Sequence, residues 1–228
     1  MSQIQKVHLT YFPLRGVVEK LRLVLEAGGI PYEETRLRPK EWGAHKKSGG
    51  YLFEQLPKAT ITFEDGSTFD LFQSLTIFRY LARKAGLAGE GELNQARVEM
   101  LIDASEDLRQ KFAKVCYSPD FEKLRGPYVA ETMPVEFGKI ENILKSNGTG
   151  FLVGSSLTAA DLYLFDVVEN HIVLATDQFL EPFPLLKKHH ETVGSHAKIH
   201  AYVASGKRPQ FPNGPTAIFG GYKEEATN

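Results

Sequence analysis

The segment VHLTYFPLRG, residues 7–16, decides the fold of the N-terminal part of this chain. Apolar and polar residues alternate up to Tyr11, which is the period-two pattern of a β-strand. Pro13 has no backbone N–H and cannot continue a sheet ladder, so the strand ends near Tyr11. Apolar residues at helical spacing then run from Val17 to Leu25 and stop at a Gly-Gly pair. The sequence therefore predicts a strand, a turn and a helix, with the Tyr11 phenol at the carboxyl end of the strand.

Two interpretations of Tyr11 are open at this point. In open α/β sheets, ligands bind in the crevice where strands end and helices begin, which would make Tyr11 a site residue. A tyrosine at a strand end can also be ordinary packing, with its hydroxyl satisfied by a neighbour. The rest of the chain decides between them.

Length and composition limit the classes of protein that need to be considered. A chain of 228 residues is long enough for two domains. The 27 Lys+Arg balance 28 Asp+Glu, so nothing in the charge suggests a nucleic acid or an anionic membrane as partner. Cys116 is the only cysteine, which excludes internal disulfides and multi-thiolate zinc sites, and we expect no metal. No signal peptide or apolar run of membrane-spanning length is visible, so we expect a cytoplasmic protein with no membrane partner.

The first third of the chain completes a mixed sheet. A second strand over 32–37 makes a β-α-β unit, and a polar loop or irregular helix over 38–50 carries the only tryptophan, Trp42. Two alternating runs around an Asp-Gly turn, 59–63 and 68–71, predict an antiparallel hairpin. Pro57 precedes the hairpin at a position where a cis bond is possible. A helix opens at Gln73-Ser74 and stops at Gly86.

Beyond a glycine-containing linker over 86–93, the pattern is helical throughout. We expect a helix ending before Tyr117 and a second over 121–146, kinked or split at Pro134. Thr158 and Asp161 form a capping box that opens a further helix, and short helices cover 184–193 and 197–204. A Gly- and Pro-rich tail follows from about residue 206. The predicted fold is α/β plus all-α, with one domain over 1–86 and a helical bundle over 87–228.

Four motifs together resemble the cytosolic glutathione transferases of the tyrosine type, a family of enzymes with a thioredoxin-like N-terminal domain. They are YFPLRG at 11–16, QLPK at 55–58, QSLTI at 73–77 and EDLR at 106–109. The resemblance covers nearly the whole chain and is closest to the pi class. Val17 and the spacing between Trp42 and Lys46 are instead similar to the mu and sigma classes, so the class stays open.

The resemblance implies a role for each matching residue. Tyr11 would donate its hydroxyl to the sulfur of glutathione, the cosubstrate, and Asp107 would reach glutathione across a homodimer interface into which Phe53 inserts as an aromatic key. The remaining glutathione-binding residues would be Trp42, Lys46, Gln55, Leu56, Pro57, Gln73 and Ser74, with Lys47 as an alternative to Lys46. Phe12, Leu14, Tyr117 and Phe219 would line the pocket for a hydrophobic electrophile, and Tyr117 would also donate to that electrophile.

The chemistry that the resemblance implies is physically reasonable. A free thiol is only a few per cent ionised at neutral pH, and a hydrogen bond from a neutral phenol favours the thiolate. The expected activity is therefore conjugation of glutathione to electrophiles, as in detoxification. Two other interpretations use the same fold: a glutathione-dependent isomerase similar to sigma-class proteins, and a non-catalytic ligand-binding or crystallin-like protein.

Overall fold

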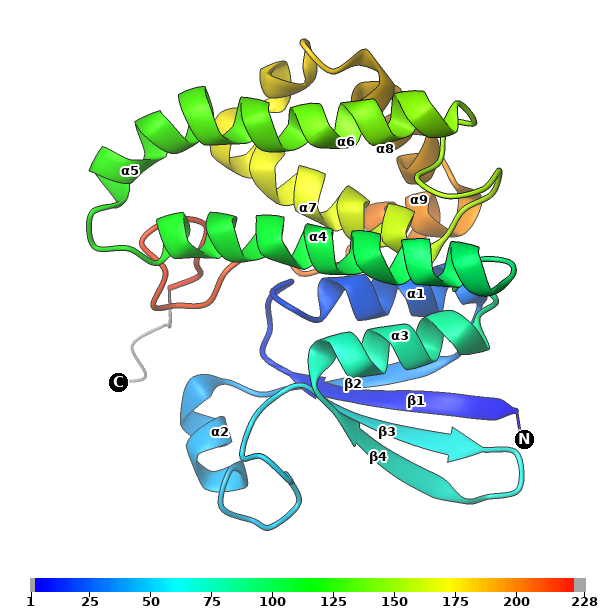
Figure 1. Ribbon diagram of the computed structural model, residues 1–228. Helices are drawn as coiled ribbons and strands as arrows, with labels where there is room; N and C mark the ends of the chain where they lie inside the picture. Colours follow the sequence, from blue (N-terminus) through cyan, green and yellow to red (C-terminus); the bar gives the residue numbers. More distant parts are fainter. Residues whose placement is uncertain (1–2, 224–228) are drawn as a thin grey trace.

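The computed structural model describes residues 3–223, and its N-terminal part is a four-stranded sheet with helices. Figure 1 shows α1 and α3 between this sheet and the long helix α4, whereas α2 lies beyond the end of the sheet at which β1 terminates. No helix in the described range is long and apolar enough to cross a membrane. The N-terminal elements are β1 (Ile4–Tyr11), α1 (Glu19–Gly28), β2 (Tyr32–Arg36), α2 (Pro39–His45), β3 (Lys58–Phe63), β4 (Thr68–Phe72) and α3 (Ser74–Lys84).

The strand order β2-β1-β3-β4 confirms the mixed sheet expected from the sequence. β1 is parallel to β2 and antiparallel to β3, and β3 is antiparallel to β4. Val7 and Leu9 of β1 lie opposite Ile61 and Ala59 of β3, and all four side chains are buried. Alternation in both strands thus points one set of apolar side chains at the helices, because successive side chains of a strand face opposite sides. The Tyr11 end of β1 is left at the edge of the core.

The rest of the chain is helical, which confirms the predicted fold class. Figure 1 shows α7 among the other helices, and most of its residues are buried, including polar ones such as Asp161, Asp166 and His171. The elements are α4 (Glu92–Cys116), α5 (Phe121–Pro127), a π-helical turn (Tyr128–Thr132), α6 (Met133–Asn147), α7 (Ala159–Ala175), a 3₁₀ turn (Asp177–Leu180), α8 (Pro184–Gly194) and α9 (Ala197–Ala204).

The helix predicted over 121–146 is split, but not at Pro134 itself. The division is the π-helical turn, which comes before Pro134, and Pro134 lies in the first turn of α6. A proline there cannot donate to the carbonyl four residues earlier, so the hydrogen-bond ladder has to shift. The Met133 N–H accordingly donates to the Tyr128 carbonyl, five residues back.

The predicted capping box of α7 is present and does more than cap. Asp161 Oδ2 accepts from Thr158 N (2.8 Å) and Thr158 Oγ1 (2.7 Å). Its other oxygen, Oδ1, accepts from Leu152 N at 2.8 Å and lies 2.9 Å from Nε2 of His189 in α8. Asp161 is fully buried, so this carboxylate joins the start of α7 to the preceding loop and to α8.

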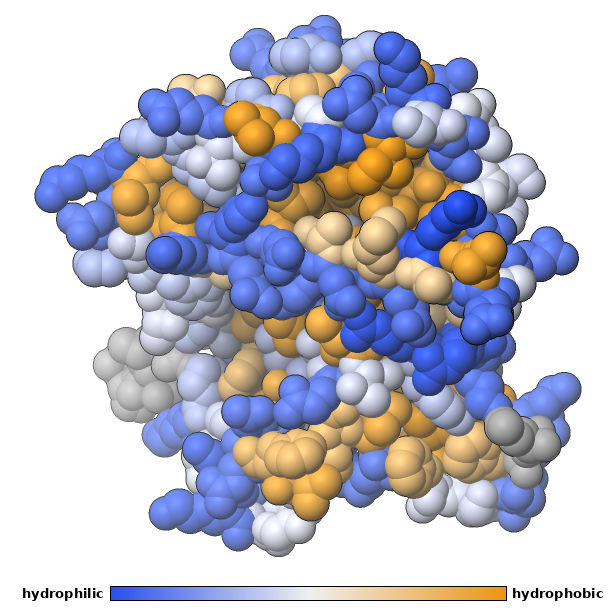
Figure 2. Space-filling view, in the orientation of Figure 1, coloured by the Kyte–Doolittle hydropathy of each residue, from blue (hydrophilic) through white to orange (hydrophobic). Residues whose placement is uncertain are grey.

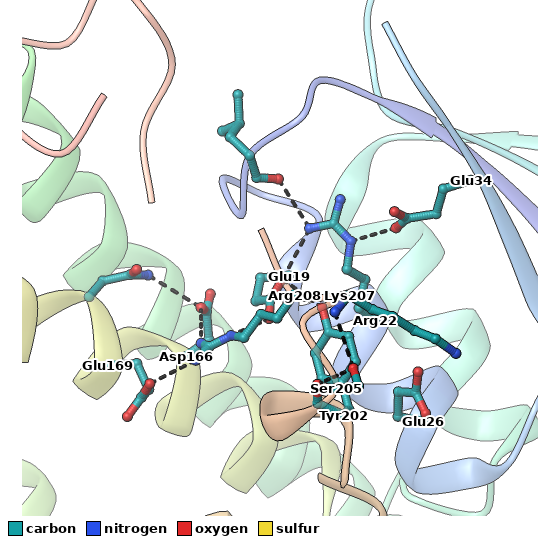
Figure 3. Close-up of polar contacts among 12 residues, drawn as sticks. Glu19, Arg22, Glu26, Glu34, Asp166, Glu169, Tyr202, Ser205, Lys207 and Arg208 are labelled. Carbon is teal, nitrogen blue, oxygen red and sulfur yellow. Dashed lines mark hydrogen bonds and ion pairs between the residues drawn. The ribbon is translucent and has the colours of Figure 1, made fainter. Parts of the chain in front are cut away.

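A buried network of charged side chains fixes the start of the C-terminal tail (Figure 3). Arg208 Nε donates to Glu19 Oε1 of α1 at 2.7 Å, and Arg208 Nη1 donates to Glu169 Oε2 of α7 at 2.8 Å. Arg22 continues the network, because its Nη1 donates to Glu19 Oε2 at 3.0 Å and its Nε to Glu34 Oε1 at 2.5 Å. Removing one partner of such a buried ion pair leaves an uncompensated charge, so Arg208 holds the tail firmly against α1 and α7.

Candidate functional site

Tyr11 lies where β1 ends and lines an open cavity of about 750 Å³. Phe12 and Leu14, from the turn after β1, line the same cavity, and so does Tyr117 at the end of α4. Residues of the sheet unit and of the helical part therefore meet around Tyr11. Three of the four residues expected in an electrophile pocket are brought together here.

The Tyr11 phenol is held in its neutral form. Burial raises its pKa above the ordinary value of 10.0, and the backbone N–H of Val17, which donates to Tyr11 Oη at 3.5 Å, offsets this only in part. A neutral phenol keeps its proton and can donate it in a hydrogen bond. Next to a thiol, such a donor favours the ionised sulfur, because a charge-assisted hydrogen bond is stronger than a neutral one.

A second, smaller cavity of about 200 Å³ lies beside the N-terminus of α3. Its lining includes the five glutathione-binding residues expected around the Leu-Pro turn and the start of this helix, namely Gln55, Leu56, Pro57, Gln73 and Ser74. The Leu56–Pro57 peptide bond is cis. The first N–H groups of a helix have no partner within it and carry the positive end of its dipole, so this cavity suits a carboxylate.

Gln73, just before α3, has an unusual backbone conformation. Its φ of 70° is positive, a region that few residues other than glycine occupy. It is the N-cap residue of α3, whereas Ser74 is the first residue within the helix. Such conformations cluster at ligand sites, where the surrounding structure holds them. The strain at Gln73 therefore supports a binding role for this turn.

Val17 connects the two cavities. It lines the smaller one, and its backbone N–H contacts the Tyr11 hydroxyl that lines the larger one. A ligand with a carboxylate at the start of α3 can thus extend to Tyr11 and there meet a second, apolar molecule in the larger cavity.

Of the other predicted site residues, Trp42, Lys46 and Asp107 do not line either cavity, whereas Phe53 lines the smaller one. Trp42 in α2 packs edge-on against Tyr51, with ring centroids 4.9 Å apart, and Lys46 at the end of α2 pairs with Glu54 at 3.8 Å. Asp107 is exposed on α4. Phe53 lines the smaller cavity but is 52% exposed and contacts Phe72 edge-on. Their predicted roles in holding glutathione or a second subunit stay predictions.

The C-terminal tail supplies cavity residues that the sequence did not identify. Gly214, Pro215, Thr216 and Lys223 line the larger cavity, as does Pro39. An Asn-Gly-Pro sequence signals a turn, but nothing local indicates that this turn returns to β1. Phe219 is not among the lining residues. It stacks on Phe121, with ring centroids 5.1 Å apart and planes at 12°, so it anchors the tail and does not face the cavity.

Cys116 does not have the properties of a reactive thiol. It is fully buried, and burial raises the pKa of its thiol to about 12. The thiolate is the nucleophilic form, so this side chain is inert at neutral pH.

Comparisons with known proteins agree with this geometry. Residues 7–83 match the profile described as "Glutathione S-transferase, N-terminal domain", and residues 106–206 match "Glutathione S-transferase, C-terminal domain". Glutathione S-transferase P 1 of Xenopus laevis is 34% identical over 91% of this chain and 96% of its own length. Glutathione S-transferase of Dirofilaria immitis is 34% identical over 90% and 95%.

Solved structures give the same result. The pi-class glutathione S-transferase of Onchocerca volvulus superposes with a TM-score of 0.82 at 30% identity, covering 93% of this chain and 99% of that structure. The sigma-class enzyme of Fasciola hepatica also has a TM-score of 0.82, but at 24% identity it supports the fold alone.

Proposed function

This chain belongs to the glutathione S-transferase family, and we propose that it conjugates glutathione to hydrophobic electrophiles at the Tyr11 cavity. One observation carries this proposal. A partly buried, neutral phenol lies between a small cavity at a helix N-terminus and a larger, mainly apolar cavity. This arrangement suits one polar cosubstrate with a carboxylate and a thiol, and one apolar cosubstrate.

Glutathione lies with its γ-glutamyl carboxylate at the N-terminus of α3, where Gln73 and Ser74 receive it. Its cysteinyl backbone pairs with the Leu56 backbone, beside Gln55 and Pro57, and its sulfur reaches Tyr11. The family resemblance adds Trp42 and Lys46, with Lys47 as the alternative, for the glycyl carboxylate. Both lysines are exposed near α2, on the side of the sheet where β1 ends.

The reaction begins with ionisation of the thiol. The Tyr11 hydroxyl donates to the sulfur and stabilises the thiolate, and lowering a thiol pKa by ~2 units requires about 2.7 kcal/mol. One charge-assisted hydrogen bond together with the electrostatic field of a helix N-terminus can provide this. The thiolate then attacks a carbon of the electrophile, which lies against Phe12 and Leu14, and Tyr117 donates to the electrophile.

The test is a conjugation assay with 1-chloro-2,4-dinitrobenzene, comparing wild type with Tyr11→Phe. We expect roughly a 10- to 100-fold loss of kcat/KM, a higher pKa of the bound thiol and nearly unchanged glutathione binding. Tyr32→Phe is the matched control. The Tyr32 hydroxyl, in β2, donates to Glu26 in α1, and Tyr32 lines neither cavity. Full activity of Tyr11→Phe would contradict the proposed role.

A homodimer completes the proposal. Leu52, Phe53 and Phe69 are 52–74% exposed, and Figure 2 shows apolar side chains gathered over this N-terminal part of the face. Contiguous exposed apolar surface is typical of interaction sites. In the dimer, Phe53 inserts into the partner and Asp107 reaches the partner's glutathione.

Phe53→Ser should yield monomers in light scattering, and Asp107→Ala should weaken glutathione binding in a variant that is still dimeric.

Three further proposals rest on the family resemblance. We propose a role in detoxification, a cytoplasmic location, and a boundary between the two domains near residue 86. The boundary is supported by the change from mixed sheet to helices between α3 and α4. Limited proteolysis of the segment 86–91 would test it.

A further inference from the structure

The C-terminal tail makes a direct hydrogen bond to Tyr117. The backbone N–H of Gly214 donates to Tyr117 Oη at 2.7 Å, a short distance for a bond of this type. Gly214 and Tyr117 both line the larger cavity. A residue 97 positions later in the chain therefore contacts the functional atom of Tyr117.

This bond restricts where the Tyr117 proton can lie. A hydroxyl has one proton and two acceptor positions, and it rotates to suit its partners. The Gly214 N–H occupies one acceptor position, so the Tyr117 proton cannot point toward the tail. It is left to donate to a group in the cavity.

The tail loop, residues 211–222, is fixed to the end of α4 next to Tyr117. The N–H groups of Ile218 and Phe219 both donate to the Cys116 carbonyl, at 2.9 and 3.1 Å. Within the loop, Asn213 Nδ2 donates to the Phe219 carbonyl at 2.9 Å. The loop thus holds Tyr117 at two points: the carbonyl of the preceding residue and the Tyr117 hydroxyl.

The same loop contacts the turn after Tyr11. The Arg15 N–H donates to the Phe211 carbonyl at 2.9 Å, and the Gly16 N–H donates to the Pro212 carbonyl at 3.0 Å. The partly buried Arg208 fixes the chain just before the loop through its ion pairs with Glu19 and Glu169 (Figure 3). The tail loop consequently sets the position of Tyr117 relative to the Tyr11 turn.

Gly221 allows the loop to close on Gly214. A Cβ at position 221 would lie 2.3 Å from the Gly214 carbonyl oxygen, far inside any allowed contact. A side chain there would push Gly214 away by about 1 Å. The Gly214 N–H would then leave the Tyr117 hydroxyl.

We propose that Gly214 and Gly221 are positioning residues that orient the Tyr117 hydroxyl as a proton donor, and that they favour electrophiles in which negative charge develops on oxygen. This inference rests on the proposed function. With an epoxide, the thiolate forms the C–S bond, the C–O bond breaks, and the alkoxide oxygen takes the Tyr117 proton, which water then replaces. With an aryl halide, chloride leaves and no such proton is needed.

The test compares an epoxide, 1,2-epoxy-3-(4-nitrophenoxy)propane, with 1-chloro-2,4-dinitrobenzene in wild type, Gly221→Ala, Tyr117→Phe and the double variant. We expect Gly221→Ala to lower kcat for the epoxide by roughly 10-fold or more, since a misplacement of ~1 Å can cost up to ~10². The KM for glutathione and the kcat for the aryl halide should stay within about two-fold. In the Tyr117→Phe background, Gly221→Ala should have no further effect on epoxide turnover.

Gly126→Ala is the matched control, because an added Cβ there, in α5, meets no atom within 4 Å. Asn213→Ala, which loosens the loop without adding atoms, provides a second route if Gly221→Ala does not fold. Equal losses for both substrates, or an undiminished effect in the Tyr117→Phe background, would overturn the inference. So would a wild type that conjugates the aryl halide and leaves the epoxide unchanged. A wild type inactive with both substrates would overturn the proposed function and the inference that rests on it.

Discussion

Lys20, in α1, is a fully buried lysine whose charge should make stability depend on pH. Its Nζ lies 3.3 Å from Tyr163 Oη in α7 and 3.8 Å from Glu106 Oε2 in α4. Arg109 also donates two hydrogen bonds to Glu106, so the Glu106 carboxylate is shared between Arg109 and Lys20. Burial lowers the pKa of Lys20 to about 7, although Glu106 and Asp166 favour its charge and Arg109 opposes it.

The direction of the pH effect follows from proton binding. Between about pH 7 and 10.5, the unfolded chain keeps the Lys20 proton and the folded protein has released it. The free energy of unfolding therefore rises with pH across this window. One pKa unit corresponds to about 1.4 kcal/mol, so the gain between pH 7 and pH 9 is about 2 kcal/mol after allowing for partial ionisation at pH 7. Lys20→Met should lack this gain.

The assay is urea unfolding of wild type and Lys20→Met at pH 7, 8 and 9, at a single protein concentration. Wild type should gain about 2 kcal/mol relative to Lys20→Met over this range. Lys145→Met, on the exposed face of α6, is the matched control and should follow wild type. A difference between wild type and Lys20→Met that stays constant within about 0.5 kcal/mol would refute the reasoning.

Three other predictions follow from buried or cavity-lining groups. Burial lowers the pKa of His171 to about 4, so the unfolded chain binds a proton between pH 7 and 5 that the folded protein does not. In urea unfolding, wild type should therefore lose about 2 kcal/mol of unfolding free energy over this range that His171→Gln does not lose. An equal loss in the two proteins would contradict this. Asp161→Ala leaves several buried donors unpaired and should cost more than about 3 kcal/mol in urea unfolding, and a loss below 1 kcal/mol would be inconsistent with its contacts. Lys223 is the charged residue among those that line the larger cavity, so Lys223→Gln should raise the KM for 4-chloro-3,5-dinitrobenzoate about three-fold and leave that for the corresponding benzamide unchanged. Equal changes for the acid and the amide would rule out a charge effect.

Local sequence was sufficient for most of the fold. Alternation up to Tyr11 and the stop at Pro13 predicted the first strand, and the Asp-Gly turn predicted the hairpin. The Thr158–Asp161 capping box also depends only on neighbouring residues. The sequence predicted that the helix over 121–146 would be split, but not the position of the split. The point at which the backbone hydrogen bonds change their spacing depends on how both flanking helices pack.

The candidate site was only partly accessible from the sequence. Motifs around Tyr11, Leu56 and Gln73 resembled a known family, and the structure brings these segments to two adjoining cavities. The positive φ of Gln73 could not be anticipated, since the local preference of glutamine opposes it. Phe219 was expected in the cavity because it is an aromatic residue in the tail, yet it stacks on Phe121.

The sequence by itself determined the elements, the mixed sheet, the helical second part and the family, because these depend on periodicity, turn residues and short motifs. Only the tertiary structure decided which side chains share a cavity, how the tail returns to Tyr117, that Lys20 is buried, and that Arg208 pairs with Glu19 and Glu169. Such contacts join residues far apart in the chain, for example Glu19 and Arg208, which are 189 positions apart. Their partners are set by the packing of α1, α4, α7 and the tail together, and no local preference specifies them.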